Sequence, residues 1–216
     1  MDDETTDLEG SQGGTAATLD ELIERTAGPQ PWRKAFHAFN AVVIAVALEY
    51  LSPSRGVSVL ALIAMASTLV IVDAARLTNL SANELFFRTF NRLASPREAR
   101  RIASSTWYAL GMLVAVAAFP LHAAVSGVLV LGLCDPAAAY VGRRFGTRPL
   151  LGGTLEGSLA FFVVAALILG LRHSWPAALA AAAAGAIAER RSWPLDDNLT
   201  IPVVCAAVIQ ATEWIA

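Results

Sequence analysis

Apolar residues gather in seven long runs along the chain, each separated from the next by a short polar or charged stretch. Runs of this length, without the alternation of a half-buried strand, predict helices buried in protein or in a membrane. Several runs fall short of the roughly 20 residues that a straight membrane span needs, and the Ala-rich run 176–188 is the weakest. The predicted spans are residues 36–51, 57–75, 107–121, 123–141, 155–171, 176–188 and 199–215.

Residues 83–95 follow a different pattern. Leucine and phenylalanine side chains recur there at helical spacing, while Arg88 and Arg92 lie four residues apart on the polar side. We interpret this stretch as an amphipathic helix at the lipid headgroups, with an ordinary connecting helix as the alternative.

The first 31 residues hold eight acidic residues and one basic residue, and they lack a long apolar run. This composition predicts a disordered acidic tail and is not that of a signal peptide. Within it, Thr18 and Glu21 form a capping-box pattern that favours a short helix over Leu19–Arg25.

Composition strengthens the membrane interpretation. Hydrophobic residues make up 56% of the 216 residues and charged residues only 16%, where a soluble domain carries about 25%. The mean hydropathy is +0.54. These values argue against a soluble domain, a coiled coil and a disulfide scaffold. We therefore expect an all-α integral membrane protein, with residues 32–216 forming one polytopic domain of about seven transmembrane helices plus the interfacial helix.

The charges indicate an orientation. If the spans alternate, 14 of the 16 basic residues fall on the side of the N-terminus, and only Arg55 and Arg172 fall on the other. The positive-inside rule then places the N-terminus in the cytoplasm. The acidic residues of the segment 32–216 are distributed in the same way, since only Glu49 and Glu213 lie on the far side. Acidic residues and arginines gathered on one side suggest a cytoplasmic site that binds an anionic ligand together with a cation. The Arg and Ala bias suggests a prokaryotic inner membrane.

Asp135 is a candidate metal ligand, because it ends an apolar run and carboxylates within membranes are usually functional. A salt bridge to a neighbouring arginine is the alternative. The pair Arg143 and Arg144, followed by Gly146, comes two to three turns later. Together these residues form a polar mouth on an apolar helix.

Two further polar stretches open predicted spans. In the first, Thr154 is a candidate N-cap, and backbone N–H groups at such a helix start can hold phosphate. Glu156 on the first turn is either a partner of the helix dipole or a metal ligand. In the second, Asp196, Asp197 and Asn198 offer oxygen ligands suited to Mg²⁺, and Asn198 or Asp197 can also cap the last span.

Other polar residues carry less information. Arg33, Lys34 and His37 share a helix face at the first span, where snorkelling explains them equally well. Asp73 and Arg76 suggest a structural ion pair. His122 and His173 fall on the far side and suggest interface residues rather than ligands, and Cys134 and Cys205 suggest packing. The sequence contains no P-loop, kinase glycine loop, GxSxG or HExxH motif.

The order of the motifs resembles the polyprenol kinase family, which includes dolichol, phytol and farnesol kinases and CTP-dependent diacylglycerol kinases. The motifs are RKAFH, Asp73 with Arg76, PREARRIASSTWYALG, DPAAAYVGRRFG, GGTLEGS and Glu189-x7-Asp-Asn-x3-Pro. They run from about Arg33 to the C-terminus. The resemblance implies a lipid kinase that uses CTP as phosphoryl donor, distantly related to phosphatidate cytidylyltransferases.

The resemblance also implies a site. Asp135 and Asp197, with Glu156 or Glu189, would hold Mg²⁺, and Glu98 or Glu189 would accept the proton of a lipid hydroxyl. The nucleotide would contact Arg33, Lys34, Arg143, Arg144, Gly146, Thr154, Glu156, Gly157, Ser158 and Asn198. We expect CTP, a membrane lipid alcohol and the bilayer as partners, and no nucleic acid; a homodimer is left open.

One position departs from the family pattern. Relatives often carry Lys where this chain has Gly153, so Arg148, Arg144 or Lys34 would have to substitute for it. Two other functions remain as alternatives, a CTP:lipid cytidylyltransferase and a small membrane transporter. The acceptor stays open between an isoprenoid alcohol and diacylglycerol.

Overall fold

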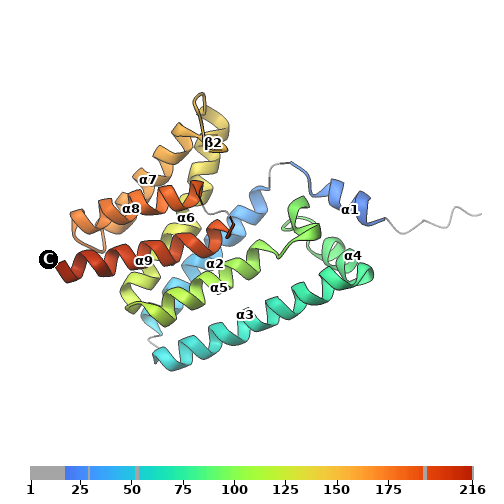
Figure 1. Ribbon diagram of the computed structural model, residues 1–216, viewed down its shortest axis with the longest axis horizontal. Helices are drawn as coiled ribbons and strands as arrows, with labels where there is room; N and C mark the ends of the chain where they lie inside the picture. Colours follow the sequence, from blue (N-terminus) through green and yellow to red (C-terminus); the bar gives the residue numbers. More distant parts are fainter. Residues whose placement is uncertain (1–17, 29, 52–53, 192–193, 216) are drawn as a thin grey trace, which may run out of the picture.

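The fold is almost entirely helical in the computed structural model, which describes residues 18–28, 30–51, 54–191 and 194–215 (Figure 1). The predicted acidic tail therefore lies mostly outside the described residues. In chain order the elements are α1 (Leu19–Arg25), α2 (Pro31–Tyr50), α3 (Arg55–Thr78), α4 (Leu80–Thr89), η1 (Pro96–Arg100), α5 (Ser104–Ala118), α6 (Leu121–Phe145), β1 (Pro149–Leu150), β2 (Gly153–Thr154), α7 (Leu155–Gly170), α8 (Trp175–Arg190) and α9 (Asp197–Ile215).

Each of the seven predicted apolar runs corresponds to one long helix, namely α2, α3 and α5 to α9. The weakest run is α8, which forms a full helix because its alanines pack in the core between α7 and α9. Within the described residues, three helices, α3, α6 and α9, are long and apolar enough to cross a membrane. Seven crossings therefore remain a prediction.

Small residues let the helices approach closely around α6, which packs against α2, α5, α7 and α9. A Cβ added at Gly132 of α6 would collide with Ala41 of α2, and one at Gly127 would collide with the backbone of Pro202 in α9. Close approach of this kind is common between helices in membranes, where small residues replace the hydrophobic effect as the source of tight packing.

Polar contacts show that successive helices run in opposite directions. At one end, Lys34 near the start of α2 meets Asp135 in the second half of α6. At the other end, Arg172 in the α7–α8 turn forms an ion pair with Glu49 near the end of α2. Alternation gathers the charged loops at one end of the bundle, as the basic-residue count predicts.

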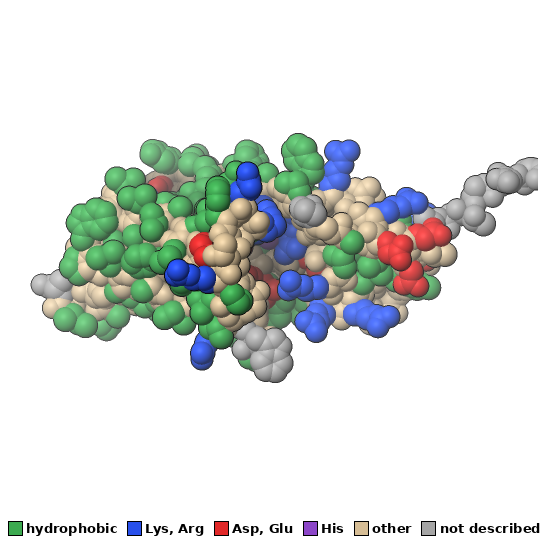
Figure 2. All heavy atoms as spheres, turned by 90° about the horizontal axis from the view of Figure 1, so that it is seen from above, with side chains coloured by type: hydrophobic (Ala, Val, Ile, Leu, Met, Phe, Trp, Pro, Cys, Tyr) green, Lys and Arg blue, Asp and Glu red, His purple; other side chains and the backbone are tan. Residues whose placement is uncertain are grey.

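The outer surface of the bundle is apolar. Large side chains such as Val43, Leu60 and Ile71 are 45%, 67% and 67% exposed, and hydrophobic side chains cover one half of the face shown in Figure 2. Basic and acidic side chains gather over the other half. A continuous exposed apolar surface of this kind is typical of a protein embedded in a membrane.

The amphipathic stretch is shorter than predicted. Helix α4 runs from Leu80 to Thr89 rather than to residue 95, because the chain turns at Phe90, whose carbonyl oxygen accepts from the N–H groups of Leu93 and Ala94. Phe87 turns inward and is fully buried against Leu22 of α1 and Ala94. The predicted α1 helix is confirmed. That α4 lies at the lipid headgroups remains a prediction.

Candidate active site

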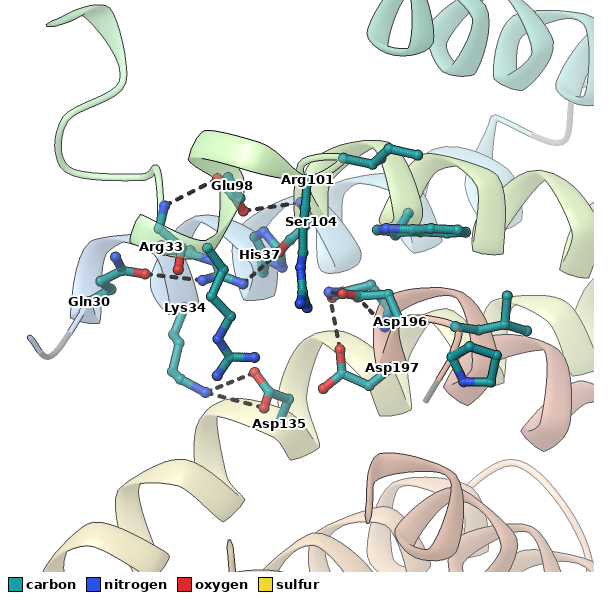
Figure 3. A pocket seen from close by; sticks show the side chains of 17 residues that line it. Gln30, Arg33, Lys34, His37, Glu98, Arg101, Ser104, Asp135, Asp196 and Asp197 are labelled. Carbon is teal, nitrogen blue, oxygen red and sulfur yellow. Dashed lines mark hydrogen bonds and ion pairs between the residues drawn. The ribbon is translucent and has the colours of Figure 1, made fainter. Parts of the chain in front are cut away.

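A cavity of about 800 Å³ opens at the charged end of the bundle (Figure 3). Its walls come from the start of α2, the segment 95–107, the second half of α6 and residues 194–198. The charged side chains among its lining residues are four bases and four acids, namely Arg33, Lys34, Arg97, Arg101, Glu98, Asp135, Asp196 and Asp197. Segments more than 100 residues apart in the sequence thus meet in one polar pocket.

Asp135 is held by a basic residue from another helix. Lys34 Nζ donates to both carboxylate oxygens of Asp135, at 3.1 and 2.9 Å. The two side chains are 26% and 30% exposed, so the pair faces the cavity rather than the apolar core. The salt bridge considered as an alternative for Asp135 exists, but it is made with Lys34 and not with a neighbouring arginine. The predicted metal role of Asp135 is untested.

Asp196 immediately precedes α9, which begins with Asp197 and Asn198, and all three residues line the cavity. Asp196 Oδ1 accepts from the backbone N–H of Asn198 at 3.1 Å and also from its side-chain amide. The amide nitrogen of Asn198 lies 3.2 Å from Asp197 Oδ1. Asp196 is therefore the helix cap, whereas sequence reasoning favoured Asp197 or Asn198. The cap leaves Asp197 directed towards the cavity (Figure 3).

Negative charge concentrates around Asp197. The carboxylates of Asp196, Asp135 and Glu189 all lie close enough to interact with it electrostatically. Among the ion pairs of the described residues, none joins Asp196 or Asp197 to a basic side chain. Asp196 and Asp197 are half-buried, and carboxylates drawn out of water without a cationic partner are costly, so this corner of the cavity is suited to a bound cation.

Glu98 has a different environment from the one expected of a general base. It is 6% exposed, and its two carboxylate oxygens accept from the backbone N–H groups of Ser95 at 3.1 Å and Ser104 at 3.0 Å. Both oxygens are thus occupied in joining η1 to the start of α5. We assign Glu98 a positioning role in place of the predicted proton transfer.

The pair Asp73 and Arg76 fixes the same segment from behind. Arg76 is 2% exposed and donates to Asp73, to the carbonyl oxygen of Glu98 and, at 2.6 Å, to that of Arg101. Asp73 Oδ2 accepts from the N–H of Ala103 at 2.9 Å. The predicted ion pair is present, and it ties α3 to the backbone of the cavity wall.

Positive charge enters the cavity from two segments. Arg33 is oriented by bonds to Gln30 Oε1 at 3.0 Å and to Ser104 Oγ at 2.7 Å. Arg97 and Arg101 line the cavity from the segment 95–107. Sequence reasoning did not select these two arginines, although they lie inside the motif that begins at Pro96.

A second group of predicted residues lies outside the cavity, where α6 ends and α7 begins. Glu156 accepts from Thr147 Oγ1 at 2.8 Å and from the N–H of Arg148 at 3.4 Å, so its carboxylate closes the loop between α6 and α7. Gly157 packs against Gly142, about 10 Å along α6 from Asp135. The predicted metal trio of Asp135, Glu156 and Asp197 is not assembled in the cavity. The other predicted nucleotide contacts in this group are Arg143, Arg144, Gly146, Thr154 and Ser158, none of which lines the cavity.

An arginine from α8 completes this second group. Thr154 caps α7 by accepting from the N–H of Gly157 at 3.2 Å, and Arg190 Nε donates to Ser158 Oγ at 2.9 Å. A Cβ added at Gly153 would collide with the guanidinium group of Arg190. Arg190 is thus a cation beside this helix start that the expectation of Arg148, Arg144 or Lys34 did not include. The neighbouring Glu189, whose side chain is 9% exposed, forms an ion pair with Arg190. Its carboxylate also lies close enough to Asp135 and Asp197 to interact with them electrostatically.

Comparison with known proteins gives three related enzymes. The chain is 34% identical over 149 residues to CTP-dependent diacylglycerol kinase 1 of Schizosaccharomyces pombe, covering 57% of this chain and 68% of that protein. It is 33% identical over 98 residues to the Eremothecium gossypii enzyme of the same name, covering 44% of this chain and 31% of the relative.

The third relative, CTP-dependent diacylglycerol kinase 1 of Saccharomyces cerevisiae, is 30% identical over 99 residues, covering 44% of this chain and 34% of the relative. The matched stretch thus spans about two thirds of the fission-yeast protein but only about a third of the other two. No family model and no solved structure matches the chain.

Proposed function

We propose a function for this chain, which belongs to the family of the CTP-dependent diacylglycerol kinases. It transfers the terminal phosphoryl group of CTP to the hydroxyl of a membrane lipid alcohol. The observation that carries the proposal is the cavity, in which four bases and four acids meet at one end of an apolar helix bundle. Phosphoryl transfer needs such positioned charges more than it needs a strong nucleophile.

The triphosphate would be bound by the basic side chains of the cavity. Arg33, Arg97 and Arg101 line it from two walls, and guanidinium groups suit phosphate because they donate in a planar fork. The buried bonds of Arg76 to the backbone of residues 98 and 101 hold one of these walls in place. A preorganised array of this kind stabilises charge on the transferred group without reorganising during the reaction.

The carboxylates of the cavity fit a divalent cation such as Mg²⁺. Asp197 and Asp196 offer hard oxygen ligands, lie beside Asp135 and Glu189, and have no basic partner in an ion pair among the described residues. When bound, the ion would neutralise charge on the phosphates. Glu156 is left out of this proposal, because its oxygens close the turn before α7.

Diacylglycerol is the acceptor that we propose, since the named relatives act on it. Ile102, Trp107 and Leu195 add apolar wall to the cavity, which opens at the end of a bundle with an apolar outer surface. A lipid headgroup can therefore reach the charged residues while its acyl chains remain outside among the hydrophobic side chains. An isoprenoid alcohol remains the alternative acceptor.

In the reaction, the lipid hydroxyl oxygen forms a bond to the terminal phosphorus of CTP as the bond from that phosphorus to the bridging oxygen breaks. The products are lipid phosphate and CDP. We assign the released proton to Asp135, because this carboxylate faces the cavity and Lys34 fixes it in place. A weak base is sufficient here, since the transition state of phosphoryl transfer is loose.

The test uses the full chain in mixed micelles with Mg²⁺, CTP labelled at the terminal phosphate, and either diacylglycerol or an isoprenoid alcohol. We expect label in phosphatidate, with CTP preferred over ATP. Asp135→Asn should lower the rate by at least 100-fold, whereas Asp20→Asn, an exposed change on α1, should leave it unchanged.

Other outcomes would point elsewhere. Label in an isoprenoid phosphate alone would replace the acceptor but keep the kinase. If pyrophosphate were released and label from the first phosphate of CTP entered the lipid, the protein would be a cytidylyltransferase. No transfer of any label by folded protein, or full activity of Asp135→Asn, would overturn the proposal.

A further inference from the structure

The end of the bundle opposite the cavity contains a cluster of two imidazoles and a carboxylate. His122 lies in the first turn of α6, His173 in the turn between α7 and α8, and Glu213 near the end of α9. One ligand atom from each of the three residues lies within 4.8 Å of the other two. None of them belongs to the proposed kinase site, which uses the other end of α2, α6 and α9.

The three side chains are already arranged around one carboxylate. Glu213 Oε2 lies 2.9 Å from His122 Nε2, and Glu213 Oε1 lies 2.9 Å from His173 Nδ1. The imidazole ring centroids are 5.8 Å apart. Zinc bound tetrahedrally at about 2.0–2.1 Å separates its ligand atoms by about 3.3 Å. Shifts of about 1 Å would therefore convert this arrangement into a coordination shell.

A neighbouring serine supports the ring that is buried. The side chain of His173 is 2% exposed, and its second nitrogen, Nε2, lies 2.8 Å from Ser126 Oγ. A histidine that binds metal through one nitrogen usually donates from the other to an oxygen, which fixes its orientation and tautomer. With an ion bound, Ser126 can accept that proton, which leaves the lone pair of Nδ1 for the ion; without one, Nδ1 donates to Glu213 Oε1.

The remaining charge near the cluster is balanced. Arg172 Nε donates to Ser126 Oγ at 2.8 Å, which would place an uncompensated positive charge beside a metal ion. However, the same guanidinium group forms an ion pair with Glu49. His122 and Glu213 are 53% and 36% exposed, so an ion can enter from outside and keep a water ligand.

We propose that His122, His173 and Glu213 form a binding site for Zn²⁺, or for a similar imidazole-binding transition metal, which joins the ends of α6 and α9 to the α7–α8 turn. Imidazole nitrogen selects such metals over Mg²⁺, which prefers oxygen ligands. The site is distinct from the cation site proposed for the kinase reaction, and it does not depend on that reaction.

The test measures Zn²⁺ binding by the full chain in detergent, prepared without a polyhistidine tag, stripped with chelator and held in excess Mg²⁺ to saturate oxygen-ligand sites. We expect one Zn²⁺ per chain and a raised thermal midpoint of unfolding. Co²⁺ in place of Zn²⁺ should give the visible absorption of a tetrahedral site.

Variants then identify the ligands. His122→Gln and Glu213→Gln, both at partly exposed positions, should each weaken Zn²⁺ binding by at least tenfold, because even an outer partner such as Ser126 is worth about 10–100-fold. His37→Gln, a matched control in the cavity at the other end, should bind Zn²⁺ as the unaltered chain does. Absence of stoichiometric Zn²⁺ binding, or equal binding by the His122→Gln/Glu213→Gln double variant, would overturn the proposal.

Discussion

Replacing Arg76 with glutamine tests whether a buried ion pair holds the cavity wall. Arg76 is 2% exposed and donates to Asp73 and to the carbonyl oxygens of Glu98 and Arg101. Glutamine cannot replace these bonds, so the variant leaves a carboxylate at 4% exposure and two carbonyl oxygens without this donor. Breaking a buried pair from one side costs about 3–5 kcal/mol, or about 10²- to 10⁴-fold in the folding equilibrium.

Arg55 provides the matched control. It also donates to two backbone carbonyl oxygens, those of Ala117 at 2.6 Å and Phe119 at 3.1 Å, but it is exposed and lies at the other end of the bundle. Arg55→Gln should therefore cost less than about 1 kcal/mol. Arg76→Lys should be intermediate, because an ammonium group keeps the charge of the pair but loses the planar fork of donors.

The assay measures thermal unfolding in detergent and the rate of lipid phosphorylation on the same preparations. We expect Arg76→Gln to lower the unfolding midpoint and to abolish activity, with Arg55→Gln close to the unaltered chain in both. If Arg76→Gln matched Arg55→Gln in midpoint and in rate, the segment 98–103 would be held by something else, and the argument from burial would be refuted.

Three further changes test the contributions of single residues, the first to activity and the other two to stability. Lys34→Met should raise the KM for CTP or lower the rate at least tenfold with little effect on the unfolding midpoint, since the pair with Asp135 is partly exposed and worth about 0–1 kcal/mol; retention of full activity would contradict this. Glu98→Gln should cost about 1–3 kcal/mol, measured as a lower midpoint, because one amide oxygen cannot replace both carboxylate acceptors; an unchanged midpoint would argue against the positioning role. Gly157→Ala should cost about 1–3 kcal/mol of stability and so lower the midpoint, since its Cβ would lie 2.9 Å from a carbonyl oxygen of α6. The control Gly56→Ala, whose Cβ meets nothing within 4 Å, should raise the midpoint slightly.

The helices could be predicted from the sequence because each is an uninterrupted apolar run, and a run needs no knowledge of its neighbours. All seven runs appear as helices, including the short Ala-rich run that forms α8. The end of α4 could not be placed from periodicity alone. Its apolar residues continue at helical spacing past Thr89, but Phe87 packs inward and the chain turns at Phe90.

The candidate site could be predicted only in part, because spacing along the chain does not say which way a carboxylate points. Asp135 and Asp197 do lie at one cavity, as expected from charges that collect at one end. Glu156 instead bonds across the loop between α6 and α7, to Thr147 and Arg148. For Glu98 a local signal existed, since Ser95 and Glu98 have capping-box spacing, which points to a structural role.

The two clusters at the ends of the bundle follow from one property of the fold. Helices that alternate in direction bring together residues 40 or more positions apart, such as Lys34 with Asp135 and His173 with Glu213. A site built from helix ends needs no contiguous phosphate loop, which is consistent with a sequence that lacks a P-loop although its cavity gathers basic side chains of a kind suited to phosphate. Catalysis by this fold should therefore be sensitive to packing between helices. A change such as Arg76→Gln, which touches no substrate in the proposal, should be as damaging as the loss of a charged residue in the cavity itself.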